Sequence, residues 1–327
     1  MNNNTTDRVA SGQKYQHPNG TMAIKDGIKV SVEYSDDTSL KKPSWFKVPL
    51  PSGKNYRLLK DRVHNLKLSS VCEESKCPNI AECWNHGTAT LMVMGGVCTR
   101  ACKFCAVDTG NPKGWLDEAE PKKIADTIAY MSRDYVVLTS VDRDDLFDGG
   151  SNHIARCVSA SKRLSPDVVI EVLSPDFRGN LNHLDTLLDS GLDVFSQNIE
   201  TVKRLTHVVR DPRAGYQQTL KMLSHAHKKG FVSKSGMMLG LGEEKDEVIE
   251  TMKDLYHNGV KILTLGQYLR PTMNHLPVKK YIHPDEFSEY SHIGKKIGLE
   301  EVVAGPLIRS SYRADRAFMK LEETKNA

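Results

Sequence analysis

The chain has 327 residues, of which 39% are apolar and 26% are charged, a balance that allows a globular protein with a sizeable core. Its formal net charge at pH 7 is +4, a mild excess without the basic stripes that are typical of nucleic-acid-binding proteins. No window approaches 18 uncharged apolar residues, so the sequence excludes a membrane-spanning helix.

Positions 1–40 are polar and show no clear periodicity, which predicts a mobile N-terminal tail. The opening residues lack the basic and then apolar segments of a signal peptide, so we expect the protein to be cytoplasmic. Positions 41–89 gain apolar anchors and carry a first group of cysteines, and we interpret them as an N-terminal extension. We expect the main domain over 90–298 and a C-terminal extension over 299–327.

Apolar, β-rich runs alternate with helical patterns from residue 90 onward. The predicted strands are 90–96, 134–141, 167–175, 192–200, 232–240 and 260–269, and the predicted helices lie near 121–132, 151–164, 181–190, 215–229, 243–258 and 284–297. Continuous apolar strands separated by helices predict an α/β fold with a parallel sheet covered by helices. Six such units favour a partial (βα)6 barrel of the TIM type over an open doubly wound sheet.

Six of the seven cysteines form two triplets before and just after the first predicted strand. These triplets are Cys72-x4-Cys77-x5-Cys83 and Cys98-x3-Cys102-x2-Cys105. In a cytoplasmic protein, such spacing indicates metal or redox chemistry rather than disulfides. Structural zinc needs four ligands, usually as two C-x2–4-C pairs, so the triplets favour iron–sulfur clusters. A zinc site that shares ligands between the two groups is the alternative.

The seventh cysteine and an aspartate-rich stretch have simpler interpretations. Cys157 shares one helical face with apolar neighbours, which predicts a buried core position. The stretch "DRDDLFDGG" at 142–150 carries four aspartates but lacks the spacing and closing glutamate of an EF-hand. We therefore expect a loop before a helix that is tied together by Arg143.

The second triplet, with Phe104 before its last cysteine, resembles the signature of radical S-adenosylmethionine (SAM) enzymes. In that family three cysteines hold a 4Fe–4S cluster, and SAM chelates the fourth iron. The first triplet together with "RSSY" at 309–312 is similar to the lipoyl synthase family. "CPNIAECW", "TSVDRDDLFDGG", "QNIETVKRLTHVVRDPRAGY" and "KSGMMLGLGE" also resemble that family, over about residues 40–315. The family usually has Asn where this chain has Asp142.

The resemblance implies insertion of sulfur at C6 and C8 of an octanoyl chain that is attached to a lysine of a carrier protein. A 4Fe–4S cluster on Cys98, Cys102 and Cys105 would cleave SAM to methionine and a 5′-deoxyadenosyl radical, with two SAM molecules used per lipoyl group. A second, auxiliary 4Fe–4S cluster on Cys72, Cys77 and Cys83 would donate the sulfur. Its fourth ligand would be a serine of "RSSY", where Ser310 and Ser311 both match and Ser311 is favoured.

Polar residues at predicted strand ends are candidates for binding SAM, and each could instead cap a helix or complete a turn. The resemblance implies contacts with the methionyl amine of SAM from Thr139, Ser140 and Asp142, which follow the second predicted strand. By position, Glu171 and Asn198 at strand ends are candidates to bind the ribose or methionine, and Lys234 on the fifth strand is a candidate to bind the carboxylate. The segment "GMMLGLGEE" at 236–244, which includes Met238, resembles the adenine-contacting segment of the family. Missing side chains there would let the backbone approach the base, and a plain turn before a helix is the alternative.

The resemblance also implies partners. These are octanoylated lipoyl carrier domains of 2-oxoacid dehydrogenase complexes, the glycine-cleavage H protein, a flavodoxin or ferredoxin electron donor, and a cluster-assembly carrier, without nucleic acid or membrane. One alternative is another radical SAM enzyme with two clusters, such as a biotin synthase-like enzyme or a methylthiotransferase. The other alternative is a zinc-dependent structural module.

Overall fold

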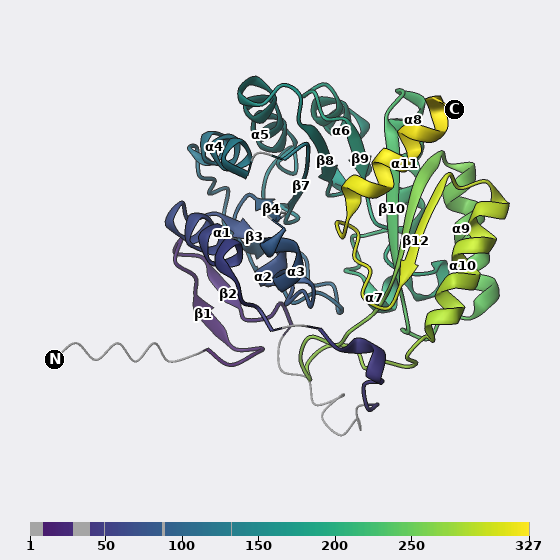
Figure 1. The fold of residues 1–327 in the computed structure, drawn as a ribbon. Coiled ribbons are helices and arrows are strands. Elements are labelled where there is room, and N and C mark those ends of the chain that lie inside the picture. The colour runs from purple at the N-terminus through teal and green to yellow at the C-terminus, as the bar shows by residue number, and fades with distance from the viewer. Residues whose placement is uncertain (1–8, 29–39, 49, 87–88, 132, 327) are drawn as a thin grey trace.

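The computed structural model describes residues 9–28, 40–48, 50–86, 89–131 and 133–326, and its centre is a curled eight-stranded sheet (Figure 1). The strand order is β12-β11-β10-β9-β8-β7-β4-β3, and all neighbours pair in parallel except β3 and β4. The strands are β3 (Ser69–Ser70), β4 (Thr90–Val93), β7 (Tyr135–Ser140), β8 (Val169–Leu173), β9 (Val194–Ser196), β10 (Val232–Leu239), β11 (Val260–Gln267) and β12 (Glu301–Gly305). Because β12 and β3 are edges, the barrel is open, as predicted.

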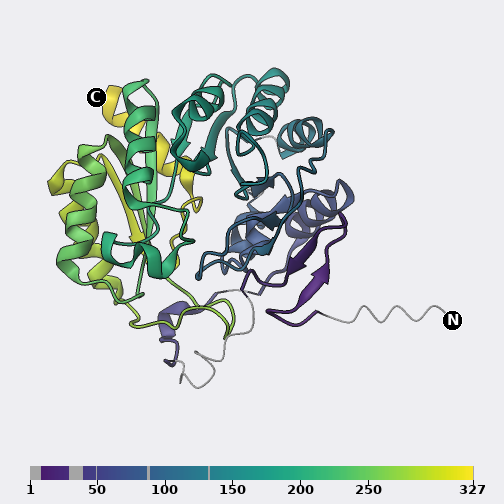
Figure 2. The same ribbon diagram turned by 180° about the vertical axis from the view of Figure 1, so that it is seen from behind.

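Helices follow the strands and cover the outer side of the sheet (Figures 1 and 2). They are α4 (Glu120–Met131), α5 (Ser151–Leu164), α6 (Leu181–Leu188), α7 (Thr206–Val209), α8 (Tyr216–Lys228), α9 (Lys245–His257) and α10 (Pro284–Ile297). Three helices precede β4: α1 (Lys54–Asn65), α2 (Val71–Glu74) and α3 (Ile80–Asn85). 3-10 turns lie at η1 (Ser44–Phe46), η2 (Phe177–Gly179) and η3 (Lys203–Leu205).

The predicted strands and helices from residue 90 onward are confirmed, and the structure adds two elements after residue 298. The first is β12, which pairs with β11, so the sheet continues past residue 298, where we expected the main domain to end. The second is α11 (Ala314–Asn326), which packs against both β7 and β12. Since β8 to β11 lie between those two strands, α11 spans the concave side of the sheet.

Residues 9–28 are ordered, which corrects the mobile tail predicted over 1–40; residues 1–8 and 29–39 lie outside the described part of the chain. The hairpin β1 (Lys14–Gln16) and β2 (Met22–Ile24) joins β5 (Val97–Cys98) and β6 (Asp108–Gly110) in a second sheet. The buried carboxylate of Asp108 on β6 holds the hairpin in this sheet. It accepts hydrogen bonds from the Tyr15 hydroxyl, Lys25 Nζ (3.3 Å) and the Asp26 N–H (2.8 Å).

We expect the substitution Asp108→Asn to loosen this hairpin while the barrel stays folded. The amide lacks the negative charge that holds Lys25, and a hydrogen bond to a charged group contributes about 1.5–3 kcal/mol. Hydrogen exchange over residues 14–24 should therefore accelerate at least about tenfold, with no change in β7 to β11. Asp61→Asn, on the exposed side of α1, is the matched control, and equal exchange in both variants would contradict the role of Asp108.

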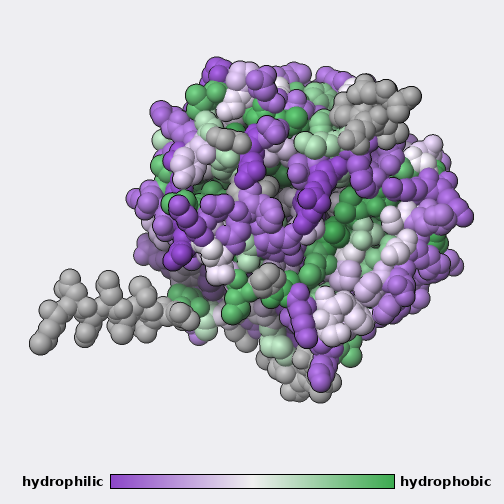
Figure 3. Space-filling view, viewed as in Figure 1, coloured by the Kyte–Doolittle hydropathy of each residue, from purple (hydrophilic) through white to green (hydrophobic). Residues whose placement is uncertain are grey.

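The surface over the β12 edge of the sheet is more apolar than the rest of the face seen in Figure 1. Apolar side chains gather in a band in the region of β12, and hydrophilic side chains cover most of the remaining face (Figure 3). Among the described residues, no helix is both long enough and apolar enough to cross a membrane.

Candidate active site

A cavity of about 560 Å³ opens at the C-terminal ends of the parallel strands, the edge at which the sequence predicts the site. Both cysteine triplets contribute to its wall, through Cys72, Cys77, Cys98, Cys102 and Cys105. All seven cysteines are free thiols. The two predicted cluster sites therefore face one shared chamber.

The second triplet lies on a loop whose sulfur atoms already accept backbone hydrogen bonds. The Arg100 N–H lies 3.4 Å from Cys98 Sγ, and the Asp211 N–H lies 3.3 Å from Cys102 Sγ. Burial raises the pKa of Cys102 to about 12 and that of Cys105 to about 11. Because a buried thiolate needs a compensating cation, this chemistry fits thiolates that bind iron rather than free thiolates.

Two buried arginines fix the loops around this triplet. Arg100 pairs with Asp144 at 2.9 Å and Asp176 at 2.7 Å, and it lies 3.3 Å from Asp142. Arg143 pairs with Asp145 at 2.7 Å, which confirms the predicted loop tied by this arginine. Asp142, Asp144 and Asp145 thus neutralise arginines, whereas Asp148 accepts the N–H groups of Gly150 and Asn152 at the start of α5.

The "RSSY" segment lies beside the first triplet although more than 220 residues separate them. The Tyr312 hydroxyl donates to Glu82 Oε1 at 3.0 Å, and Asn79 Nδ2 donates to the Leu307 carbonyl at 2.6 Å. Ser310 and Ser311 line the cavity, and neither hydroxyl has a hydrogen-bond partner among the described residues. Both hydroxyls therefore fit as the missing fourth ligand of a three-thiolate site.

A glycine on β11 lets this segment reach the cavity. A Cβ atom at Gly266 would clash with the carbonyl oxygen of Ile308, so a larger residue there would push the segment away. Gly266 belongs to the stretch "GQYLRPT", and it lines the cavity together with Ile308.

Most of the residues predicted to bind SAM line the same cavity, namely Thr139, Ser140, Asp142, Asn198 and Met238. Ser140 Oγ and Asn198 Oδ1 are buried without a hydrogen-bond partner in the described part of the chain. The backbone of Gly236 lies close to this side chain, since a Cβ atom at Gly236 would lie 2.7 Å from Asn198 Oδ1. Buried polar atoms without partners require a ligand or water, so this wall fits a polar cofactor such as SAM.

Glu171 and Lys234 are the exceptions, and their predicted position at the cavity was wrong. Lys234 Nζ lies 2.8 and 2.9 Å from the two carboxylate oxygens of Glu171, and Tyr135 donates to the same carboxylate at 2.6 Å. All three side chains are buried, and none belongs to the wall of the cavity. Because each charge already has its partner, the pair holds β8 and β10 together.

Several polar residues that line the cavity were not predicted from the sequence, among them Gln197, Glu200 and Arg210. The side-chain amide of Gln197 is buried without a partner. Burial raises the pKa of Glu200, which has a positive φ of 68° and accepts a bond from Asn198 at 3.1 Å. Such a backbone conformation is strained for a non-glycine residue and is common at functional sites. The signal was present, because both Gln197 and Glu200 lie in "SQNIE" at the end of a predicted strand.

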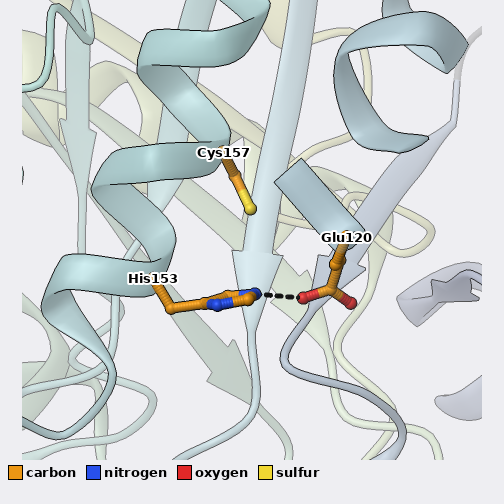
Figure 4. Close-up of side chains that lie close together, drawn as sticks. All are labelled: Glu120, His153 and Cys157. Atoms are coloured by element: carbon orange, nitrogen blue, oxygen red, sulfur yellow. Dashed lines mark hydrogen bonds and ion pairs between the residues drawn. The ribbon is translucent and has the colours of Figure 1, made fainter. Parts of the chain in front are cut away.

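A second group of ligand-type side chains lies between α4 and α5 and is formed by Glu120, His153 and Cys157 (Figure 4). His153 Nε2 lies 2.7 Å from Glu120 Oε2, which also accepts the Met94 N–H at 2.8 Å. Cys157 is fully buried in the main core, as predicted, and burial raises its pKa. The group therefore joins two helices to the end of β4.

Comparison with known proteins identifies the family to which this chain is similar. The model of the Radical SAM superfamily matches residues 92–255, and that of the N-terminal domain of lipoyl synthase of the radical SAM family matches 11–77. Lipoyl synthase of Marinobacter nauticus is 55% identical over 323 residues, which cover 98% of this chain and 93% of that protein. Lipoyl synthase of Thermus thermophilus is 57% identical over 281 residues, or 85% of this chain and 87% of that protein.

Solved structures support the fold. The FeFe-hydrogenase maturase HydG from Carboxydothermus hydrogenoformans has a TM-score of 0.51 at 13% identity, over 82% of this chain and 77% of that one. SuiB of Streptococcus suis has a TM-score of 0.50 at 13% identity, over 70% of this chain and 52% of that one. At such low identity, the likeness concerns the fold alone.

Proposed function

This chain belongs to the lipoyl synthase family of radical SAM enzymes, and we propose that the two cysteine triplets and Ser311 carry the reaction of that family in the shared cavity. Enzymes of this family insert sulfur and use SAM and two 4Fe–4S clusters. The observation that carries the assignment is that five of the six triplet cysteines, all except Cys83, line one chamber together with the serines of "RSSY". A zinc-dependent structural module would need neither the chamber nor its polar wall.

In this proposal, Cys98, Cys102 and Cys105 hold the radical cluster, and Cys72, Cys77, Cys83 and Ser311 hold the auxiliary cluster. When bound, these groups and SAM supply the radical chemistry and the sulfur, which no side-chain acid or base supplies. The protein orients the reactants: Ser140 Oγ, the Gln197 amide and Asn198 Oδ1, which have no hydrogen-bond partner among the described residues, offer donors and acceptors to SAM, and Gly236 lets the backbone approach it. Thr139, Asp142 and Met238 complete that wall.

The substrate of the proposed reaction is an octanoyl chain on a lysine of a lipoyl carrier domain, either of a 2-oxoacid dehydrogenase complex or of the glycine-cleavage H protein. Apolar residues in the cavity wall, including Met92, Leu173 and Met237, suit such a chain. A flavodoxin or ferredoxin would supply electrons, and a cluster-assembly carrier would load the iron–sulfur sites.

Anaerobic incubation of the reconstituted protein with octanoylated carrier, SAM and reductant tests the function. Mass spectrometry should find two added sulfur atoms on the carrier. Cleavage of SAM with an unchanged carrier mass would contradict lipoyl synthesis and favour another radical substrate.

The two serines of "RSSY" should differ when each is replaced. We expect Ser311→Ala to lower sulfur insertion at least about tenfold, because the auxiliary site loses a ligand, while cleavage of SAM continues. Ser310→Ala is the matched control and should retain insertion. The measurements are lipoyl formation by mass spectrometry and 5′-deoxyadenosine by chromatography. The opposite result would assign the ligand role to Ser310.

The choice of serine rather than cysteine has its own test. A serine oxygen is a harder and weaker partner for iron than a thiolate, so it leaves more easily when the cluster gives up sulfur. Ser311→Cys should therefore keep the iron and lose insertion. Full sulfur insertion by this variant would contradict the idea.

A further inference from the structure

The loop that carries Cys98, Cys102 and Cys105 forms a thin wall between the cavity and solvent. Cys102 lines the cavity, yet its two neighbours in the chain, Ala101 and Lys103, are both exposed. Of the six triplet cysteines, Cys102 alone has an exposed residue on each side. The outer surface of this loop is therefore a short route for an electron into the proposed radical cluster.

This outer surface is held rigidly by the segment 207–213. The Lys103 N–H donates to the Val209 carbonyl at 2.9 Å, and the Ala101 N–H donates to Asp211 Oδ2 at 2.9 Å. Arg213 donates to the Thr99 carbonyl at 2.8 Å. We call the resulting surface, together with the turn that leads into it, the cluster-loop face, formed by Ala101, Lys103, Lys203, His207, Val208, Pro212 and Arg213. Its shape exists before any partner arrives, as in most pre-organised interfaces.

The charges that this face shows to solvent are positive. Lys103 is exposed and has no ion-pair partner within the described residues, and Arg213 keeps 47% of its side chain exposed. Lys203, in the turn that leads into α7, is exposed and likewise unpaired. The nearby carboxylates of Asp144 and Asp211 are only 8% and 6% exposed, and arginines neutralise them.

An apolar side chain completes the surface, because Val208 is 49% exposed beside these cations. A weak, transient interface typically combines a small apolar contact with complementary charge around it. The partner that fits is therefore acidic.

We propose that the cluster-loop face is the docking surface for an acidic one-electron carrier protein. The inference rests on the proposed function, because the radical reaction is what requires the electron. In each transfer, the carrier is oxidised by one electron and the cluster held by the loop is reduced by one electron, and no atom or proton moves. Electrostatic attraction brings the carrier to the loop, and the one-residue wall at Cys102 keeps the distance short.

Charge reversal at this face tests the proposal with a purified acidic flavodoxin as the probe. Lys103→Glu and Lys203→Glu should each raise the Kd for flavodoxin about tenfold at low salt, measured by calorimetry, because like charges would then face each other. The rate at which flavodoxin hydroquinone reduces the cluster, monitored by stopped-flow absorbance, should fall by a similar factor. Cleavage of SAM driven by dithionite, which needs no docking, should not change.

Lys253→Glu is the matched control, since Lys253 is also exposed and has no ion-pair partner in the described part of the chain but lies on α9. Lys203 lies outside the cysteine loop. The Lys203→Glu variant therefore still tests the docking surface if Lys103→Glu disturbs that loop. The proposal is overturned if both variants bind flavodoxin as tightly as Lys253→Glu. If the wild type, with dithionite as the reductant, inserted no sulfur into the octanoylated carrier protein, that result would instead count against the proposed function.

Discussion

Replacing Cys102 with alanine is expected to abolish cleavage of SAM and to remove about half of the bound iron. The radical triplet would keep two thiolates, which are too few to hold a cluster, while the auxiliary triplet would be untouched. Two 4Fe–4S clusters correspond to about eight irons per chain, so the variant should hold about four. Iron analysis and chromatography of 5′-deoxyadenosine measure the two effects.

Cys157→Ala is the control for this experiment, because that cysteine is buried in the core away from the cavity. It should keep both clusters and lose only the packing of one sulfur atom. If the Cys102→Ala protein still bound about eight irons, or if Cys157→Ala lost half of its iron, the assignment of the triplets would be wrong.

Replacing Lys234 with methionine is expected to lower the free energy of unfolding by about 3–5 kcal/mol. The substitution keeps the volume but leaves the Glu171 carboxylate buried without its cation, with the Tyr135 hydroxyl as its remaining side-chain partner. The loss should be visible by chemical denaturation. The double variant Lys234→Met with Glu171→Gln should recover much of the stability, because no unpaired charge stays buried.

The barrel strands are predictable from the sequence because they are continuous apolar runs. The segments β7 and β11 bury nearly every residue, which removes the alternation that marks a half-exposed strand. β12 was not predicted because it is an edge strand, and its last three residues stay only half-buried. The hairpin of residues 14–24 escapes because its strands have three residues each and depend on Asp108, far away in the chain.

Some residues of the site were likewise predictable from the sequence, and others were not. Cysteine spacing is local information, so the triplets were identified from the sequence. Glu171 and Asn198 both follow apolar strand residues and look alike in the sequence. They differ only in register, because Glu171 lies inside β8 facing Lys234 of β10, whereas Asn198 lies past the end of β9. That difference depends on which strands are neighbours, and the strand order is a property of the whole fold.

The contact between "RSSY" and the first triplet also has a consequence for folding. Asn79 bonds to Leu307 and Glu82 to Tyr312 across 228 and 230 residues of chain. Contacts of such high contact order close the largest loops and form slowly, after local helices and neighbouring strands. We therefore expect the chamber to be completed late, so that a chain caught midway presents its thiols before its serines. The order of folding would then set the order in which the metal sites can be filled.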